Sequence, residues 1–133
     1  MAAPAWAPSP DDVARVAYEF TREAWTTDRE YAGMEAGRFT DATTPCLDHV
    51  QALIEGACRE VVGRVGTTEI RPRDQDLARQ AVVWHVAADI AAIVLPNGTE
   101  DATGMYQVHS RNYAFTLAEL ISQARMPTAL DVL

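Results

Sequence analysis

The most informative pattern in the chain is a long apolar segment, residues 77–95, which ends at Pro96-Asn97-Gly98. Its first two turns carry polar side chains on one face. Its last two turns are apolar almost all round and are interrupted only by His85 and Asp89. A helix that is apolar on every side must be surrounded by protein. The polar interruptions keep its uncharged runs below the roughly 18 residues that suggest a membrane span. We therefore expect a buried central helix.

Two earlier segments have helical periodicity and clear start signals. Ser9-Pro10-Asp11-Asp12 supplies an N-cap serine, a proline at the first helical position and acids in the first turn, and the apolar stripe that follows ends near Trp25. A second helix is predicted to begin at Thr44-Pro45 and to stop at Gly66. Its broad apolar arc is formed by Leu47, Val50, Leu53, Ile54, Ala57, Val61, Val62 and Val65. The residues between these helices, 26–44, are expected to form a loop or a short helical excursion.

The segment after Gly98 has a mixed pattern. Tyr106 and Val108 alternate with polar residues, and so do Tyr113 and Phe115, which indicates a possible short β-hairpin. Thr116-Leu117-Ala118-Glu119 has the pattern of a capping box, and it predicts a short last helix that ends at Met126-Pro127.

The fold class predicted from these patterns is all-α. We expect a small bundle of about four helices around the central helix, with the possible hairpin before the last one. The helical domain spans residues 9–125. A flexible N-terminal segment, 1–8, precedes it, and a C-terminal tail, 126–133, follows it.

Composition narrows the function classes. A chain of 133 residues with 48% hydrophobic residues is long and apolar enough to form one domain with a real core. Its formal net charge of -8 argues against a basic surface that binds nucleic acid. The first ten residues lack the basic and apolar regions of a secretion signal, so we expect an intracellular product.

The two cysteines are expected to be reduced core thiols. Cys46 and Cys58 are 12 residues apart, which is about 18 Å along one helix. A disulfide needs Cα atoms within about 7 Å. Cys46 and His49 could form half of a zinc site, but no familiar spacing supplies the other half, so we expect no metal.

Two groups of polar residues are candidates for catalysis. Glu19 and Glu23 could hold Mg²⁺ as in all-helical nucleotide pyrophosphatases, but the second helix has no matching acid pair, which favours a solvated face. His85 and Asp89 are four residues apart on the central helix and should face each other. They could act as a base with its orienting carboxylate, but no nucleophile motif accompanies them. A polar pair that faces a loop or a neighbouring subunit is favoured.

The order of elements resembles a known family. The chain opens a capped helix with PSPDDVARV, continues with HVQALIEGACREVVGRVG and LARQAVVWHVAADIA, and joins its last helix through YAFTLAEL. Over residues 9–125 this order is similar to that of the head-to-tail adaptor proteins of long-tailed bacteriophages, also called head completion or connector proteins.

The resemblance implies a virion protein of the phage neck. In that family, copies form a ring, typically of twelve, below the portal protein at the junction of capsid and tail. The ring extends the channel through which DNA passes without specific binding, and it presents a platform for the next neck protein, a stopper or tail terminator. The resemblance implies no enzymatic activity, no cofactor and no membrane, and it leaves open whether the free subunit is monomeric.

Candidate contact residues follow from the pattern and the resemblance together. Tyr18 and Trp25 form an aromatic edge off the apolar stripe, and aromatic residues are enriched at interfaces. With His85 and Asp89 they are the expected subunit interface. The apolar tail has no helix long enough to hold it, and by resemblance it docks on the portal through Pro127, Leu130, Val132 and Leu133.

Two alternatives remain at this point. One is a small all-α, metal-dependent nucleotide pyrophosphatase, and the other is a dimeric helical regulatory protein. A measured mass with a Mg²⁺-dependent activity assay separates these classes from a ring subunit.

Overall fold

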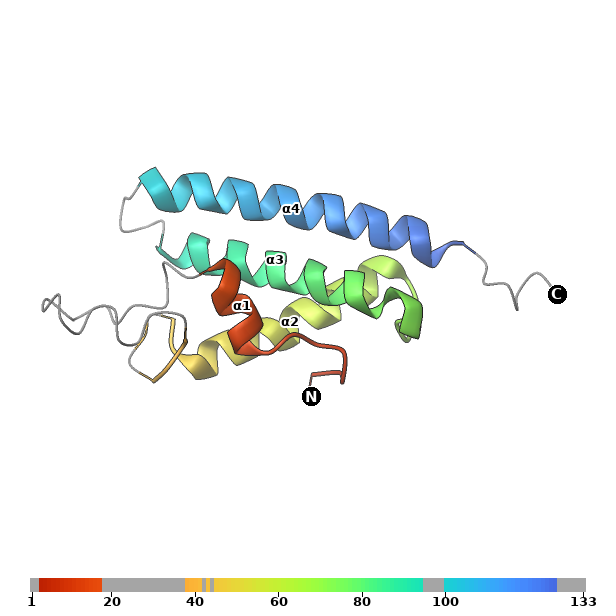
Figure 1. Ribbon diagram of the computed structural model, residues 1–133, viewed down its shortest axis with the longest axis horizontal. Helices are drawn as coiled ribbons and strands as arrows, with labels where there is room; N and C mark the ends of the chain where they lie inside the picture. Colours follow the sequence, from red (N-terminus) through yellow and green to blue (C-terminus); the bar gives the residue numbers. More distant parts are fainter. Residues whose placement is uncertain (1–2, 18–37, 42, 44, 95–99, 127–133) are drawn as a thin grey trace, which may run out of the picture.

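In the computed structural model, the described residues (3–17, 38–41, 43, 45–94 and 100–126) form four α-helices and no strand. The helices are α1 (Pro10–Val16), α2 (Leu47–Val65), α3 (Gln75–Val94) and α4 (Glu100–Ala124), and a 3-10 turn, η2 (Pro72–Asp74), leads into α3. Figure 1 shows α3 in the middle, with α4 along one side of it and α1 and α2 on the other. The predicted all-α bundle around a central helix is confirmed.

The central helix is buried through small and β-branched side chains. Most of its length is lined by alanine and valine, so the neighbouring helices can approach its backbone closely. The buried residues of α3 are Ala78, Ala81, Val82, Val86, Ala87, Ala88, Ile90 and Ala91. Val50, Ile54 and Val61 of α2 and Leu120 of α4 belong to the same core, together with Val13 and Ala14 of α1.

The start of α1 is capped as its sequence predicts. The Ser9 hydroxyl accepts a hydrogen bond from the backbone N–H of Asp12, and the Asp12 carboxylate accepts one from the N–H of Ser9, at 3.2 and 2.9 Å. This reciprocal pair satisfies two of the N–H groups that a helix start leaves open. The helix has seven residues and ends at Val16, with Ala17 as its C-cap. The expected continuation to Trp25 falls on residues outside the described part of the chain.

The N-terminal extension contributes to the core. Trp6 is buried, and its carbonyl oxygen accepts a hydrogen bond from Nε of Arg79 at 3.0 Å. The sequence predicts a flexible segment at residues 1–8, and in the structure this part of it packs against α3.

Helix α2 begins two residues later than expected. Its N-cap is Cys46, not Thr44. The cause is a turn in front of the helix: the Thr43 hydroxyl donates to the Pro45 carbonyl at 2.8 Å, and the Leu47 N–H donates to the Thr40 carbonyl at 3.0 Å. The C-cap is Gly66, as predicted, with a φ of 84° in the left-handed region that favours glycine.

The predicted β-hairpin is wrong, because residues 100–124 form one continuous helix of 25 residues. The capping box predicted at Thr116 is also wrong, since Thr116 lies inside α4. Tyr106 and Tyr113 are seven residues apart, as are Val108 and Phe115, and seven residues are two helical turns. Each of these pairs therefore lies along one side of the helix. Among the described residues, no helix has the length and apolar content needed to cross a membrane.

Candidate functional site

The polar side chains of three helices meet in an open hollow of about 190 Å³. Helix α2 supplies Glu60 and Arg64, α3 supplies His85, Ala88 and Asp89, and α4 supplies Tyr106, Ser110 and Tyr113. His85 and Asp89 therefore lie between residues of α2 and α4.

His85 lies between two carboxylates. Its Nε2 is 2.6 Å from Oε2 of Glu60, and its Nδ1 is 3.0 Å from Oδ2 of Asp89. The Asp89 contact is short, but its geometry is not that of a well-aligned hydrogen bond. The predicted pairing of His85 with Asp89 is thus present in the structure.

Tyr113 joins the same cluster from α4. Its hydroxyl donates to Oε2 of Glu60 at 2.7 Å, the oxygen that also faces His85. Its ring packs edge-on against the imidazole, with ring centroids 4.8 Å apart. One carboxylate of α2 therefore links α3 and α4, and we call Glu60, His85, Asp89 and Tyr113 the His85 cluster.

The cluster favours the protonated, charged form of His85 and the ionised form of Glu60. The contact with Asp89 raises the pKa of His85, burial opposes this, and the charges of Asp89 and Glu60 add to the rise. Burial acts to raise the pKa of Glu60, but the Tyr113 hydrogen bond and the charges of His85 and Arg64 outweigh it, so this pKa is lowered. Burial and the bond to Glu60 raise the pKa of Tyr113.

The orientation of the His85 ring limits what it could do as a general base. A histidine that acts as a general base needs a free ring nitrogen directed at the proton it removes. Both nitrogens of His85 face carboxylates instead. Ser110 lines the hollow, but within the described part of the chain no hydrogen bond connects it to His85.

The two cysteines and the Cys46–His49 pair, for which no metal is expected, are not members of this cluster. Cys46 and Cys58 are both free thiols, and burial raises the pKa of Cys58 to about 11, so that thiol stays protonated and unreactive. His49 is exposed on α2. In the ranges that the structure describes, no three His, Cys, Asp or Glu side chains are arranged to hold a metal ion.

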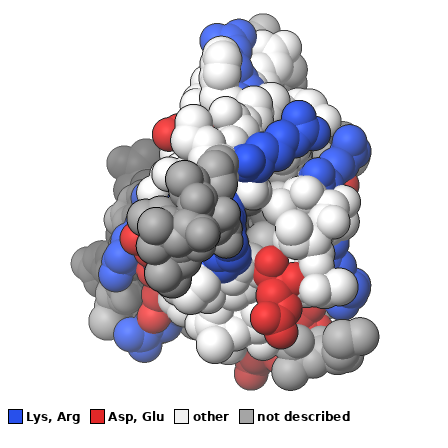
Figure 2. Space-filling model, turned by 90° about the vertical axis from the view of Figure 1, so that its right-hand side faces the viewer, with Lys and Arg blue, Asp and Glu red and all other residues white. Residues whose placement is uncertain are grey.

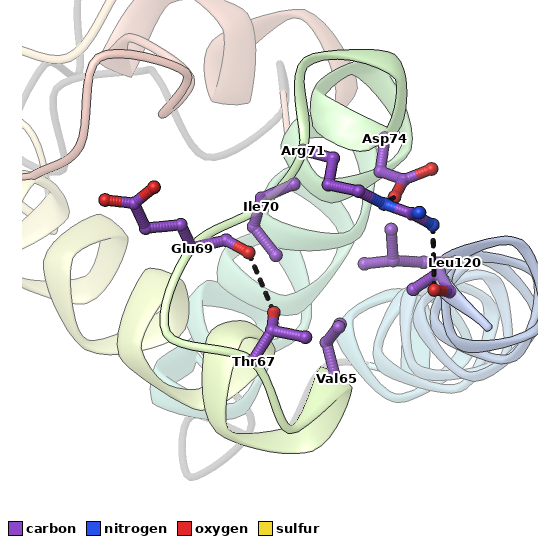
Figure 3. A pocket seen from close by; sticks show the side chains of 8 residues that line it. Val65, Thr67, Glu69, Ile70, Arg71, Asp74 and Leu120 are labelled. Carbon is purple, nitrogen blue, oxygen red and sulfur yellow. Dashed lines mark hydrogen bonds and ion pairs between the residues drawn. The ribbon is translucent and has the colours of Figure 1, made fainter. Parts of the chain in front are cut away.

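A second hollow, of about 160 Å³, lies where α4 ends (Figure 3). Its floor is apolar, with Val65, Ile70, Leu120 and Ala124, and Arg71 extends across its edge toward the last turn of α4. The side chain of Glu69 points away from it.

Two guanidinium groups bind the end of α4. Arg71 donates to the carbonyls of Gln123, Ala124 and Met126 at 3.2, 2.8 and 3.2 Å. Arg73 donates to the Gln123 carbonyl at 2.8 Å and also to that of Met126. Cationic side chains at a helix C-terminus satisfy its open carbonyls and interact favourably with its dipole.

Asp74 holds the two arginines in place. It is 2% exposed, and its carboxylate lies 3.2 Å from Nε of Arg71 and 3.6 Å from Nε of Arg73. We call Arg71, Arg73 and Asp74 the arginine clamp. Figure 2 faces this end of the molecule and shows basic side chains crossing its upper half, with an acidic patch below them.

The structure locates only part of the residues that the sequence predicted. His85 and Asp89 are half-buried neighbours in the hollow. The acids Glu19 and Glu23 and the other predicted contact residues, Tyr18, Trp25, Pro127, Leu130, Val132 and Leu133, lie outside the described residues.

Sequence reasoning missed Glu60, Tyr113 and the arginine clamp. Glu60 lies outside the apolar arc predicted for the second helix, and its neighbour in the chain, Val61, is buried. Tyr113 could have been found from the helical spacing of His109, Tyr113, Leu117 and Leu120, which all face the core from α4. The clamp has no local signal, because its arginines and their acceptor carbonyls are about 50 residues apart in the chain.

Comparison with known proteins adds no relative. No protein-family model matches the chain, and neither a curated protein nor a solved structure matches it at a significant level.

Proposed function

We propose that the chain is a structural subunit of a bacteriophage neck. Copies form a ring below the portal, of twelve subunits by resemblance, which extends the DNA channel and connects the DNA-filled head to the tail. The role is one of contact with other copies, with the portal and with the next neck protein, and it needs no cofactor or metal. The resemblance in element order is the source of this proposal, and the four-helix bundle is compatible with it.

The arginine clamp is the structural observation that supports the docking part of the proposal. It binds the carbonyls of Gln123, Ala124 and Met126, so the chain leaves the bundle from a fixed point. A segment that starts from a fixed point loses less freedom when its far end binds a partner. We propose that Pro127, Leu130, Val132 and Leu133 bind the portal from this position.

The His85 cluster supports a contact at a different part of the bundle. Asp89 remains partly exposed, and Tyr106 at the border of the hollow is 40% exposed. Tyrosine is enriched in protein interfaces because it combines apolar area with a polar group. We propose that this border, with Tyr18 and Trp25, contacts the neighbouring subunit of the ring.

The charge of the chain is compatible with a DNA channel. A net charge of -8 gives a wall that repels the duplex and does not hold it. DNA could then pass without specific binding.

Electron microscopy of purified virions tests the proposal. We expect the chain as a ring between portal and tail, with density for residues 127–133 against the portal. Infected cells offer the complementary measurement, since a neck protein must be incorporated into particles. Absence of the chain from intact virions would contradict the proposal, whatever oligomer the free protein forms.

A further inference from the structure

Helix α4 has an exposed face that nothing in the described part of the chain covers. Val108 and Phe115 are 51% and 69% exposed. They are seven residues apart, on the side of the helix away from buried His109 and Leu120. We call the line of exposed residues on this side the outer stripe; it consists of Gly104, Val108, Arg111, Phe115, Glu119 and Ser122.

The outer stripe has a self-complementary order of charges. Arg111 lies four residues before Phe115, and Glu119 lies four residues after it. Both charged side chains are exposed, and within the described residues neither has an ion-pair partner. Phe115, the largest apolar side chain of the stripe, therefore has a positive charge four residues on one side and a negative charge four residues on the other.

We propose that the outer stripe binds the outer stripe of a second copy of this chain, antiparallel, about a twofold axis at Phe115. In that arrangement the two Phe115 side chains meet at the axis. Arg111 of each copy then lies level with Glu119 of the other, which gives two equivalent ion pairs, and Val108 lies level with Ser122. A twofold interface of this kind uses the same patch on both copies.

Charge complementarity is the reason for choosing a second copy as the partner. In a parallel pair, Arg111 would lie against Arg111 and Glu119 against Glu119, and like charges across an interface are unfavourable. In the antiparallel pair both charges are matched. A partner of unrelated sequence would have no reason to match a pattern that is symmetric about Phe115.

The size of the face sets the strength of the dimer. Helix α4 has 25 residues, which is about 37 Å of length. Each copy contributes only two large apolar side chains to the contact, so the dimer should dissociate on dilution. The inference concerns the free protein and does not rest on the proposed place of the chain in a virion.

Analytical ultracentrifugation of the purified full-length chain over a range of concentrations tests the inference. We expect the mass to rise from 14.6 kDa toward twice that value as the concentration increases. Phe115→Glu should keep the protein monomeric. Because Phe115 is 69% exposed, the far-ultraviolet circular dichroism of this variant should stay that of the wild type.

Charge reversal tests the register. Arg111→Glu and Glu119→Arg should each weaken association by about tenfold, because each variant places two pairs of like charges across the interface. The double variant Arg111→Glu/Glu119→Arg should restore association, since its pairs are again opposite in charge. Arg15→Glu, an equal charge change at an exposed position of α1, is the control and should leave association unchanged.

Three results would overturn the inference. They are a mass of 14.6 kDa at every concentration, association that survives Phe115→Glu, and a double variant that associates no better than the single ones. Failure to find the chain in virions would contradict the neck proposal and leave these measurements unaffected.

Discussion

At the scale of single residues, His85 has a direct consequence for the pH dependence of stability. Its pKa in the folded chain lies above its usual value of 6.5, so its contribution to stability is fully present below pH 6.5 and is lost as pH rises through the folded pKa. The pKa of Glu60 lies below its usual 4.5, so its contribution is present above pH 4.5 and is lost as pH falls through the folded value. The cluster therefore stabilises the bundle most between these two values.

Replacing His85 by Gln should remove the alkaline limb of this profile. As the pH is raised from about 5.5 to about 8, the urea concentration at the unfolding midpoint should decrease for the wild type. The decrease should be smaller for the His85→Gln variant. The control is His49→Gln, at an exposed position of α2, which should keep the wild-type profile. If the urea midpoints of both variants depend on pH in the same way, His85 is not the cause of the decrease at alkaline pH.

At the scale of elements, two glycines near the end of α2 should respond to alanine in opposite directions. Gly63 lies inside the helix, and a Cβ there would meet nothing within 4 Å, so Gly63→Ala should raise the free energy of unfolding by about 0.5 to 1 kcal/mol. Gly66 has a φ of +84°, so Gly66→Ala should lower it by about 1 kcal/mol or more. Thermal unfolding of the two variants beside the wild type measures both changes. Equal shifts of the same sign would contradict the assigned end of α2.

The elements also show which parts of the fold the sequence could predict. The bounds of α2 and α3 follow closely from proline, glycine and apolar spacing, because those signals are local. The first half of α4 is predicted wrongly as a hairpin. Val108 and Phe115 are apolar but exposed, so the apolar positions in the sequence do not mark the buried side of this helix. Within the candidate site, the pairing of His85 with Asp89 follows from a spacing of four on one helix. The contributions of Glu60 and Tyr113 depend on how α2 and α4 are rotated against α3, and packing of the whole bundle decides that.

At the scale of the whole molecule, the bundle should fold without the C-terminal tail. A chain that stops after Met126 keeps all four helices and every carbonyl that the arginine clamp binds. We expect its melting temperature to stay close to that of the full chain. In a phage that carries this truncation, heads should fill with DNA but leak or lack tails. Unfolding of the truncated chain would instead make the tail part of the core.

A full-length variant separates the tail from its point of attachment. Arg71→Gln with Arg73→Gln removes the guanidinium groups that bind the end of α4 and leaves the tail sequence intact. If the fixed exit matters for docking, this variant should join heads to tails less well than the wild type. Normal head joining by the variant would show that the tail alone is sufficient.

The alanine lining of α3 has a consequence for how the sequence can change over time. Ala78, Ala81, Ala87 and Ala91 have no exposed surface, and adding methyl or methylene groups at such positions forces neighbouring side chains and backbone to shift, at a cost of about 1 to 3 kcal/mol each. Ala114 and Ala118 of α4 are exposed and carry no such restriction. Random mutagenesis with selection for folded protein should therefore keep alanine at the first group and diversify the second. Composition alone would treat these alanines as equivalent, whereas their tolerance to substitution depends on whether the side chain is buried in the core.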